Sequence, residues 1–180
     1  DIQVNGGCYR PLEIVTRPGS LLDPPPHLPV VGGNHETAQR VADAIFRAFE
    51  PVFPERLTAG GPTTSGTLLF AGRDAAGRFF TFYEVHGGGE GARVDRDGGS
   101  AVRVHMSNVM NTPAEVIEHD YPLAVDRQAL RRGSGGRGRH RGGEGIHRIY
   151  RCLVDGLSLT TMFERRVVPP YGLAGGAAGA

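Results

Sequence analysis

The chain has 180 residues, 39% of them apolar and 22% charged, and its formal net charge is +1 at neutral pH. This length suits one domain with a buried core, and the near-balanced charge gives no overall attraction to nucleic acid or to an anionic membrane. Two cysteines, Cys8 and Cys152, do not make a disulfide framework. No apolar run approaches the ~20 residues of a membrane helix, so a cytoplasmic protein is expected.

Residues 34–50 predict the one long helix. Val41, Ile45 and Phe49 recur at helical spacing, and Pro51 prevents the helix from continuing. The pattern is amphipathic, because charged residues occupy the other side. These are Arg40, Asp43, Arg47 and Glu50.

Most of the remaining regular structure is predicted to be strands. Residues 67–71 and 78–86 flank a turn and predict a β-hairpin. Residues 146–154 and 157–164 bracket an Asp-Gly pair, which predicts a second hairpin. Residues 102–106 alternate apolar and polar side chains, as a strand with one apolar face does.

A short helix is expected over residues 113–120, with proline at its first position and Pro122 ending it. The element order predicts an α+β fold of mostly antiparallel strands and hairpins. One longer amphipathic helix, at about 34–50, and this short helix are its helical parts.

Two polar segments could carry chemistry. Residues 84–93 place a carboxylate and a histidine before a run of glycines, whose backbone can approach an anion or a reacting carbonyl closely. Residues 105–119 combine His, Asn and Glu, which can polarise an amide carbonyl or act as a base. Both segments also have ordinary explanations. The first is then a glycine-rich loop, and in the second Glu115 completes a helix cap.

Residues 131–145 contain five Arg and seven Gly. A formal GxGxxG match lies within them, but no clear helix follows, which excludes a dinucleotide site. Arginine forks and backbone N–H groups could bind a phosphate or carboxylate. A remote alternative is an arginine- and glycine-rich RNA-binding module, which the near-zero net charge disfavours. The third interpretation is a plain surface loop, because every basic residue of this chain is Arg.

Four blocks occur together in an order that is more specific than any one motif. They are residues 83–92, 105–123, 130–145 and 169–176. In this order they resemble the B-type portion of ATP-dependent hydantoinases and 5-oxoprolinases, and residues 5–12 and 32–40 fit the same family.

The resemblance implies a division of labour. An A-type subunit or domain with an actin-like fold binds ATP and phosphorylates a small cyclic amide, and the B-type portion completes the hydrolytic opening of the C–N bond. Acetone and acetophenone carboxylases use the same pair of modules, which makes a carboxylase component the alternative. Neither nucleic acid nor membrane is an expected partner.

The resemblance also implies residue roles. The implied catalytic residues are Glu84, His105, Asn108, Asn111, Glu115 and Glu118. The implied substrate- or phosphate-binding residues are Gly87, Gly88, Gly89, Arg139, Arg141, Gly142 and Gly143. No metal ligand is expected in this chain. A divalent metal belongs to the part of the family's sequence that precedes it.

B-type portions of the family are much longer than 180 residues. The chain is therefore expected to be a fragment of a hydantoinase B/oxoprolinase domain over residues 1–180. It is expected to be truncated before Asp1, and truncation after Ala180 stays open. Alone, the fragment is expected to be inactive.

Overall fold

The structure, a computed structural model, describes residues 4–107 and 109–180. Its helices are η1 (Gly6–Tyr9), α1 (Thr37–Phe49), η2 (Pro54–Arg56) and α2 (Ala114–Asp120). Its strands are β1 (Thr67–Arg73), β2 (Phe79–Val85), β3 (Leu123–Leu130), β4 (Ile146–Cys152) and β5 (Ser158–Met162). Both predicted α-helices are present and the strands pair antiparallel, which confirms the α+β class. Within the described residues, no helix is long and apolar enough to cross a membrane.

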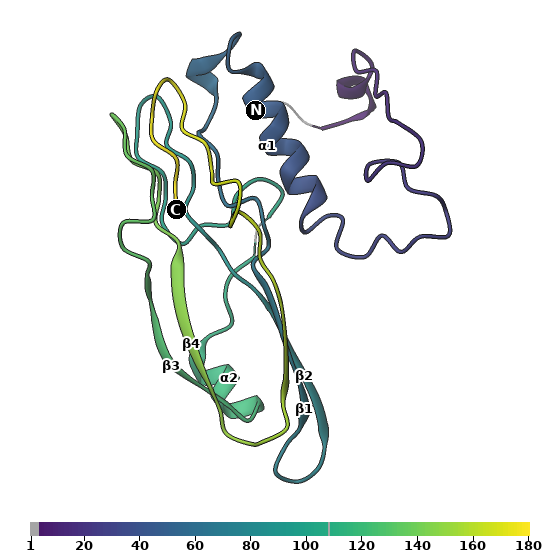
Figure 1. Ribbon diagram of the computed structural model, residues 1–180, viewed down its shortest axis with the longest axis vertical. Helices are drawn as coiled ribbons and strands as arrows, with labels where there is room; N and C mark the ends of the chain where they lie inside the picture. Colours follow the sequence, from purple (N-terminus) through teal and green to yellow (C-terminus); the bar gives the residue numbers. More distant parts are fainter. Residues whose placement is uncertain (1–3, 108) are drawn as a thin grey trace.

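The strands form two separate sheets along the long axis of the molecule (Figure 1). One sheet has the order β2-β1-β5, and the other consists of β3 and β4. Helix α2 lies beside the strands near one end, whereas α1 lies at the other end (Figure 1). The two helices, and the polar residues on them, are therefore far apart.

The first predicted hairpin is confirmed, with Thr67 opposite Val85 at its open end. Its turn is specified locally. The Asp74 carboxylate accepts a hydrogen bond from the Arg78 N–H at 2.9 Å, and Gly77 adopts φ of 79°. Glycine takes this left-handed conformation without the steric cost of a Cβ atom.

The second predicted hairpin is wrong. Strand β4 pairs with β3, where Leu123 lies opposite Cys152, and β5 pairs with β1, where Thr67 lies opposite Met162. The two strands around the Asp-Gly pair thus belong to different sheets. The strand expected at residues 102–106 is also absent from the described structure, apart from one isolated bridge between Val102 and Gly88.

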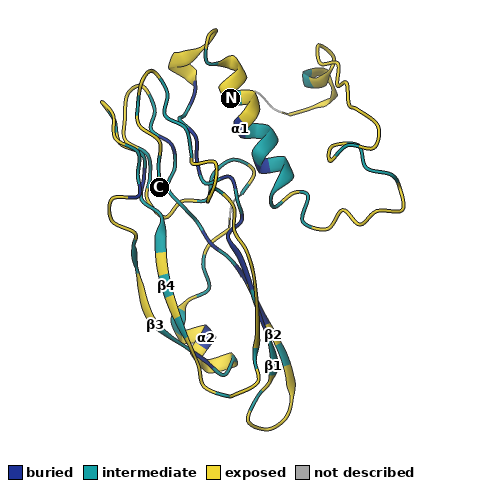
Figure 2. Ribbon diagram, viewed as in Figure 1, coloured by how far each residue is buried: buried dark blue, intermediate teal, exposed yellow. Residues whose placement is uncertain are grey.

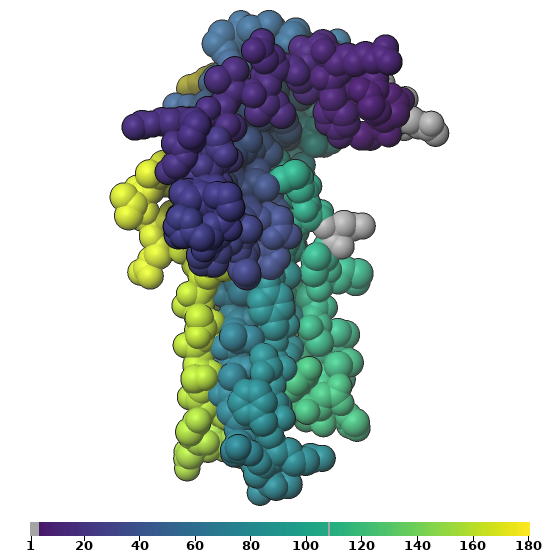
Figure 3. Space-filling model, turned by 90° about the vertical axis from the view of Figure 1, so that its right-hand side faces the viewer, coloured from purple at the N-terminus to yellow at the C-terminus, as the bar shows by residue number. Residues whose placement is uncertain are grey.

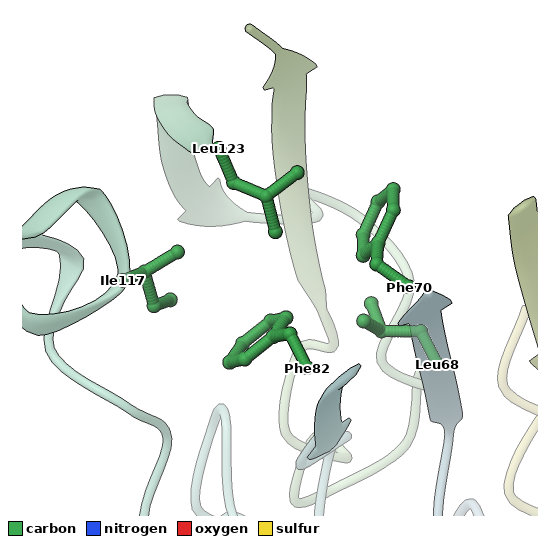
Figure 4. Close-up of a cluster of buried hydrophobic side chains, with 5 residues drawn as sticks. All are labelled: Leu68, Phe70, Phe82, Ile117 and Leu123. Atoms are coloured by element: carbon green, nitrogen blue, oxygen red, sulfur yellow. The ribbon is translucent and has the colours of Figure 1, made fainter. Parts of the chain in front are cut away.

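The hydrophobic core is small and joins both sheets to α2 (Figure 4). Alternation along each strand points every second side chain inward. The buried cluster contains Leu68 and Phe70 of β1, Phe82 of β2, Ile117 of α2 and Leu123 of β3. This cluster holds the strand end of the molecule together.

Helix α1 is amphipathic as predicted, but it turns its polar side inward. Its buried residues are Gln39 and Asp43, whereas Ile45 is 47% exposed and Phe49 is 45% exposed (Figure 2). An amphipathic helix of a globular domain usually packs its apolar side on the core. Here the polar side fits because polar partners from other segments meet it.

Extended glycine-rich segments form a layer at the α1 end, which we call the glycine layer. It consists of residues 87–91, 98–99, 135–143 and 172–179. Backbone groups hydrogen-bond directly between segments, as from Gly143 N–H to Glu90 O at 2.8 Å. A Cβ atom on Gly89 would lie 1.8 Å from the Gly143 carbonyl oxygen, so only glycine fits there. Close backbone packing therefore explains these glycines without any ligand.

Two phenylalanines of β2 test the core directly. Phe82 is 2% exposed and Phe79 is 68% exposed. Phe82→Ala is expected to lower the free energy of unfolding by about 3–5 kcal/mol, because it leaves a cavity in the core. Phe79→Ala, on the same strand, is expected to change it little. Urea unfolding followed by circular dichroism measures both, and equal effects would contradict this placement of the core.

Candidate functional site

Glu84 lies near the end of β2 with its side chain buried between the two sheets. Its carboxylate accepts a hydrogen bond from the Thr112 N–H at 2.7 Å and from the Tyr150 hydroxyl. Arg148 Nη1 donates to both carboxylate oxygens at 3.0 Å. Arg148 also donates to the Thr112 carbonyl at 2.9 Å. One carboxylate thus ties β2 to β4 and to the segment that leads into α2.

These contacts fix the charge of Glu84. Burial by itself raises the pKa of its carboxyl group. Hydrogen bonds from the His86 ring and the Tyr150 hydroxyl oppose this rise, and the Thr112 N–H and the charge of Arg148 add to them. The net result lowers the pKa of Glu84 to about 2. Burial, together with the hydrogen bond to Glu84, raises the pKa of Tyr150.

His86 completes the Glu84 cluster. Its Nδ1 lies 2.9 Å from the Gly66 carbonyl oxygen, so this nitrogen carries a hydrogen. Its Nε2 lies 3.2 Å from both Glu84 and the Tyr150 hydroxyl. Both ring nitrogens therefore have partners. A carboxylate this fully hydrogen-bonded is a weak base, so the geometry favours a positioning role for Glu84 over proton abstraction.

A second polar cluster surrounds Asp43 of α1. Arg165 forms an ion pair with its carboxylate, and His105 Nε2 lies 3.5 Å from Asp43 Oδ1, at the far limit of a hydrogen bond. The Tyr171 hydroxyl donates to the Asp43 carbonyl at 3.0 Å. Burial raises the pKa of Asp43, but His105 and Arg165 outweigh burial and lower it.

His105 has an unusual backbone. Its φ is 60°, in the left-handed region that residues other than glycine seldom adopt, and its ring meets Phe46 edge-on with centroids 5.1 Å apart. Such strain is retained where surrounding contacts enforce it, and it is common at functional sites. The buried ring next to a buried carboxylate is the arrangement that acid–base histidines use.

A chain of hydrogen bonds extends from the Asp43 cluster. Ser107 Oγ lies 2.8 Å from Gln39 Nε2 and 3.1 Å from Arg103 Nη2, and Arg103 also reaches Ser65 Oγ at 3.1 Å. Three buried atoms lack a partner within the described residues: Glu36 Oε2, Gln39 Oε1 and Arg103 Nη1. Both hydrogen-bond donors and acceptors are thus available there to water or a small polar group.

The structure divides the expected catalytic residues. Asn111 lies close to Glu84, where its Nδ2 donates to the Val85 carbonyl at 3.3 Å. Glu115 and Glu118 are exposed on α2, at the opposite end from α1 (Figure 1). Glu118 accepts from the Val125 N–H at 2.9 Å. Asn108 lies outside the described residues.

A cavity of about 980 Å³ lies against the glycine layer. Four of the expected binding residues line it: Gly89, Arg139, Gly142 and Gly143. Gly87, Gly88 and Arg141 are not in its lining, and Gly88 instead packs against Pro62. Arg165 and Tyr171 also line the cavity, which connects its wall to the Asp43 cluster.

Sequence reasoning missed the buried partners of these clusters. Arg148 and Tyr150 stand two apart on an expected strand and so share a face, which was a usable signal. Asp43 and Arg165 gave no such signal. Asp43 sits on the charged side of an amphipathic helix, and Arg165 lies 122 residues away from it along the chain. Among the described residues, no group of three or more His, Cys, Asp or Glu side chains is placed to hold a metal ion.

Comparison with known proteins identifies relatives along the whole chain. A family model described as hydantoinase B/oxoprolinase matches residues 1–180. An uncharacterized protein of Methanocaldococcus jannaschii is 39% identical over the full chain, which covers 31% of that protein. The 5-oxoprolinase 1 of Arabidopsis thaliana is 39% identical over 98% of the chain and 13% of its own length.

Two further likenesses bear on assembly and fold. A protein of a Pseudomonas species, named as the putative B-type subunit of a D-/L-hydantoinase, is 31% identical over 96% of the chain and 28% of its own length. An acetone carboxylase structure, nucleotide-free, superimposes with a TM-score of 0.61 at 23% identity, over 78% of this chain and 19% of that one. The chain spans less than a third of the length of each of these relatives.

Two arginines of β4 test whether the Glu84 cluster is a structural joint. Arg148→Met is expected to cost about 3–5 kcal/mol of unfolding free energy, because it leaves Glu84 as a buried charge without its cation. Arg151→Met removes an exposed pair with Asp126 and is expected to change stability little. Thermal and urea unfolding distinguish them. An Arg148→Met chain as stable as Arg151→Met would exclude the joint.

Proposed function

Because the chain belongs to the hydantoinase B/oxoprolinase family, we propose that it forms part of the B-type portion of an ATP-dependent enzyme that hydrolyses a cyclic amide. The substrate class is a lactam, imide or hydantoin. The observation that carries this proposal is the similarity along the whole chain to proteins named 5-oxoprolinase, at 36–39% identity in plant, slime mould, yeast and another fungus.

The partner in this proposal is an A-type subunit or domain that binds ATP and phosphorylates the cyclic amide. The name of the Pseudomonas relative makes it one of several hydantoinase subunits, which supports a multi-subunit arrangement. ATP is therefore not assigned to this chain. Its share of the work is to hold the activated, anionic amide and to direct water to the activated carbon.

His105 is the acid–base group in this proposal. It combines a buried imidazole, a carboxylate neighbour in Asp43 and a strained backbone. Asp43 also links it, through Arg165 and Tyr171, to the wall of the large cavity. Water attack on the activated carbon releases a proton, which a neutral imidazole accepts. Glu84 has the positioning role, because it anchors the segment that carries Asn111 and Thr112.

The cavity is the proposed place for the phosphorylated amide. Arginines of different segments line it, including Arg93, Arg139 and Arg165. A phosphate group favours such a wall, because guanidinium groups form paired, charge-assisted hydrogen bonds with its oxygens. The exposed Arg139 side chain is free to move toward an anion, whereas Arg165 is held by Asp43.

The experiment uses the B-type polypeptide that contains this chain, together with its A-type partner, ATP and either 5-oxoproline or hydantoin. Ring opening coupled to ADP formation is the expected result. His105→Gln is expected to lower kcat by about 10²–10⁴-fold with a smaller change in KM, because it removes proton transfer but keeps the side chain polar. His119→Gln, at an exposed position of α2, is the control and is expected to keep kcat.

Two outcomes would count against the proposal in different ways. ATP-dependent fixation of bicarbonate into a ketone, with no ring opening, would move the chain to the carboxylase branch. Full kcat in His105→Gln would remove His105 from the chemistry but leave the hydrolytic function standing.

A further inference from the structure

The outward side of α1 is apolar. Ile45 and Phe49 are exposed on the helix, and Val52 and Phe53 continue the exposed apolar surface just beyond it. The rings of Phe49 and Phe53 lie 5.7 Å apart. We call these four residues the α1 apolar face. A surface helix in contact with water would gain from polar residues at these positions, so the face is built for contact with something apolar.

The neighbouring N-terminal segment has the same character. Residues 4–31 run around the α1 end as loops and turns without a strand or an α-helix, and they form an overhang in the space-filling view (Figure 3). Ile14, Val15 and Leu21 are among the exposed apolar residues there. A loop segment rich in exposed aliphatic side chains also calls for an apolar surface to contact.

The total exposed area supports this. The chain exposes 12247 Å². A compact monomer of 19.2 kDa exposes about 8,400 Å² by the usual scaling. The difference amounts to several standard interfaces, each of which buries about 800 Å² per partner. This fold therefore leaves room for extensive further contacts.

We propose that the α1 apolar face is covered by another part of a longer B-type polypeptide to which this sequence belongs. Relatives from an archaeon, a plant and a bacterium all carry the matched stretch within a chain at least three times as long. A face without charged residues resembles a permanent interface more than a transient one. The inference rests on the family membership used for the proposed function and not on the hydrolytic step.

The inverted helix follows from this proposal. The buried side of α1 supplies Gln39 and Asp43 to the polar clusters, and the outward side receives the remaining polypeptide. Helix α1 is then fully buried in the complete enzyme, between the His105 region and the covering element. Contacts on the α1 apolar face would thus help to position Asp43 against Arg165 and His105.

The test compares the same substitutions in two contexts. One is this chain alone. The other is a chimera in which this chain replaces the matched stretch of the Methanocaldococcus jannaschii relative. Ile45→Asp and Phe49→Asp are expected to leave the isolated chain as soluble as before, or more soluble. In the chimera they are expected to reduce the soluble yield several-fold and to lower Tm, because each buries a charge at the interface. Ala44→Asp, at an exposed position on α1 away from the stripe, is the control and is expected to be tolerated in both.

Because the chain has no tryptophan, stability is followed by circular dichroism and mass by light scattering. Equal effects of Phe49→Asp in both contexts would overturn the proposal. So would an isolated chain that is a dimer and becomes monomeric with Phe49→Asp, since a second copy would then cover the face. A chimera that is insoluble without substitutions would also count against it. None of these results depends on ring opening, so this inference and the proposed function can fail separately.

Discussion

One buried carboxylate holds the two sheets in register. Glu84 belongs to β2, and its hydrogen-bond donors come from β4 and from the segment before α2. Removing a charge from water is costly, and this one is compensated only when Arg148, Tyr150 and the Thr112 N–H are all in place. The apolar core between the sheets is small, so this polar joint determines how β1–β2 and β3–β4 face each other and where Asn111 lies.

At the other end of the molecule, backbone packing replaces side-chain packing. Segments of the glycine layer approach so closely that a Cβ atom on Gly143 would lie 1.9 Å from the Gly99 carbonyl oxygen. Such a layer forms a rigid wall because its N–H and carbonyl groups bond to one another. The wall supports the large cavity, and Arg165 with Tyr171 ties it to α1. The same glycines therefore serve the fold whether or not a ligand binds there.

Local signals in the sequence were sufficient where the structure is local. The β1–β2 hairpin and both α-helices follow from turn residues, proline positions and helical spacing. Pairing partners far along the chain were not accessible in this way. The Asp-Gly pair favoured a hairpin between β4 and β5, but β3 and β1 offered longer ladders. The orientation of α1 was equally hidden, because it depends on polar partners such as His105 and Arg165, which lie more than 60 residues away. For the site, the sequence singled out Glu84 and His105, but not the residues that hold them.

Glu84 is, above all, a hydrogen-bonded anion that positions its surroundings and is not a base. The most direct measurement is a pH titration of the Glu84 side-chain carboxyl by carbon-13 NMR, in the folded chain with labelled glutamate. A lowered pKa means that the anion stabilises the fold above the ordinary glutamate range and that this stabilisation is lost as the pH falls toward the folded-state value. We expect the Glu84 signal to remain that of the ionised form far below the reference value of 4.5, toward a midpoint of about 2. A midpoint at or above 4.5 would contradict this role.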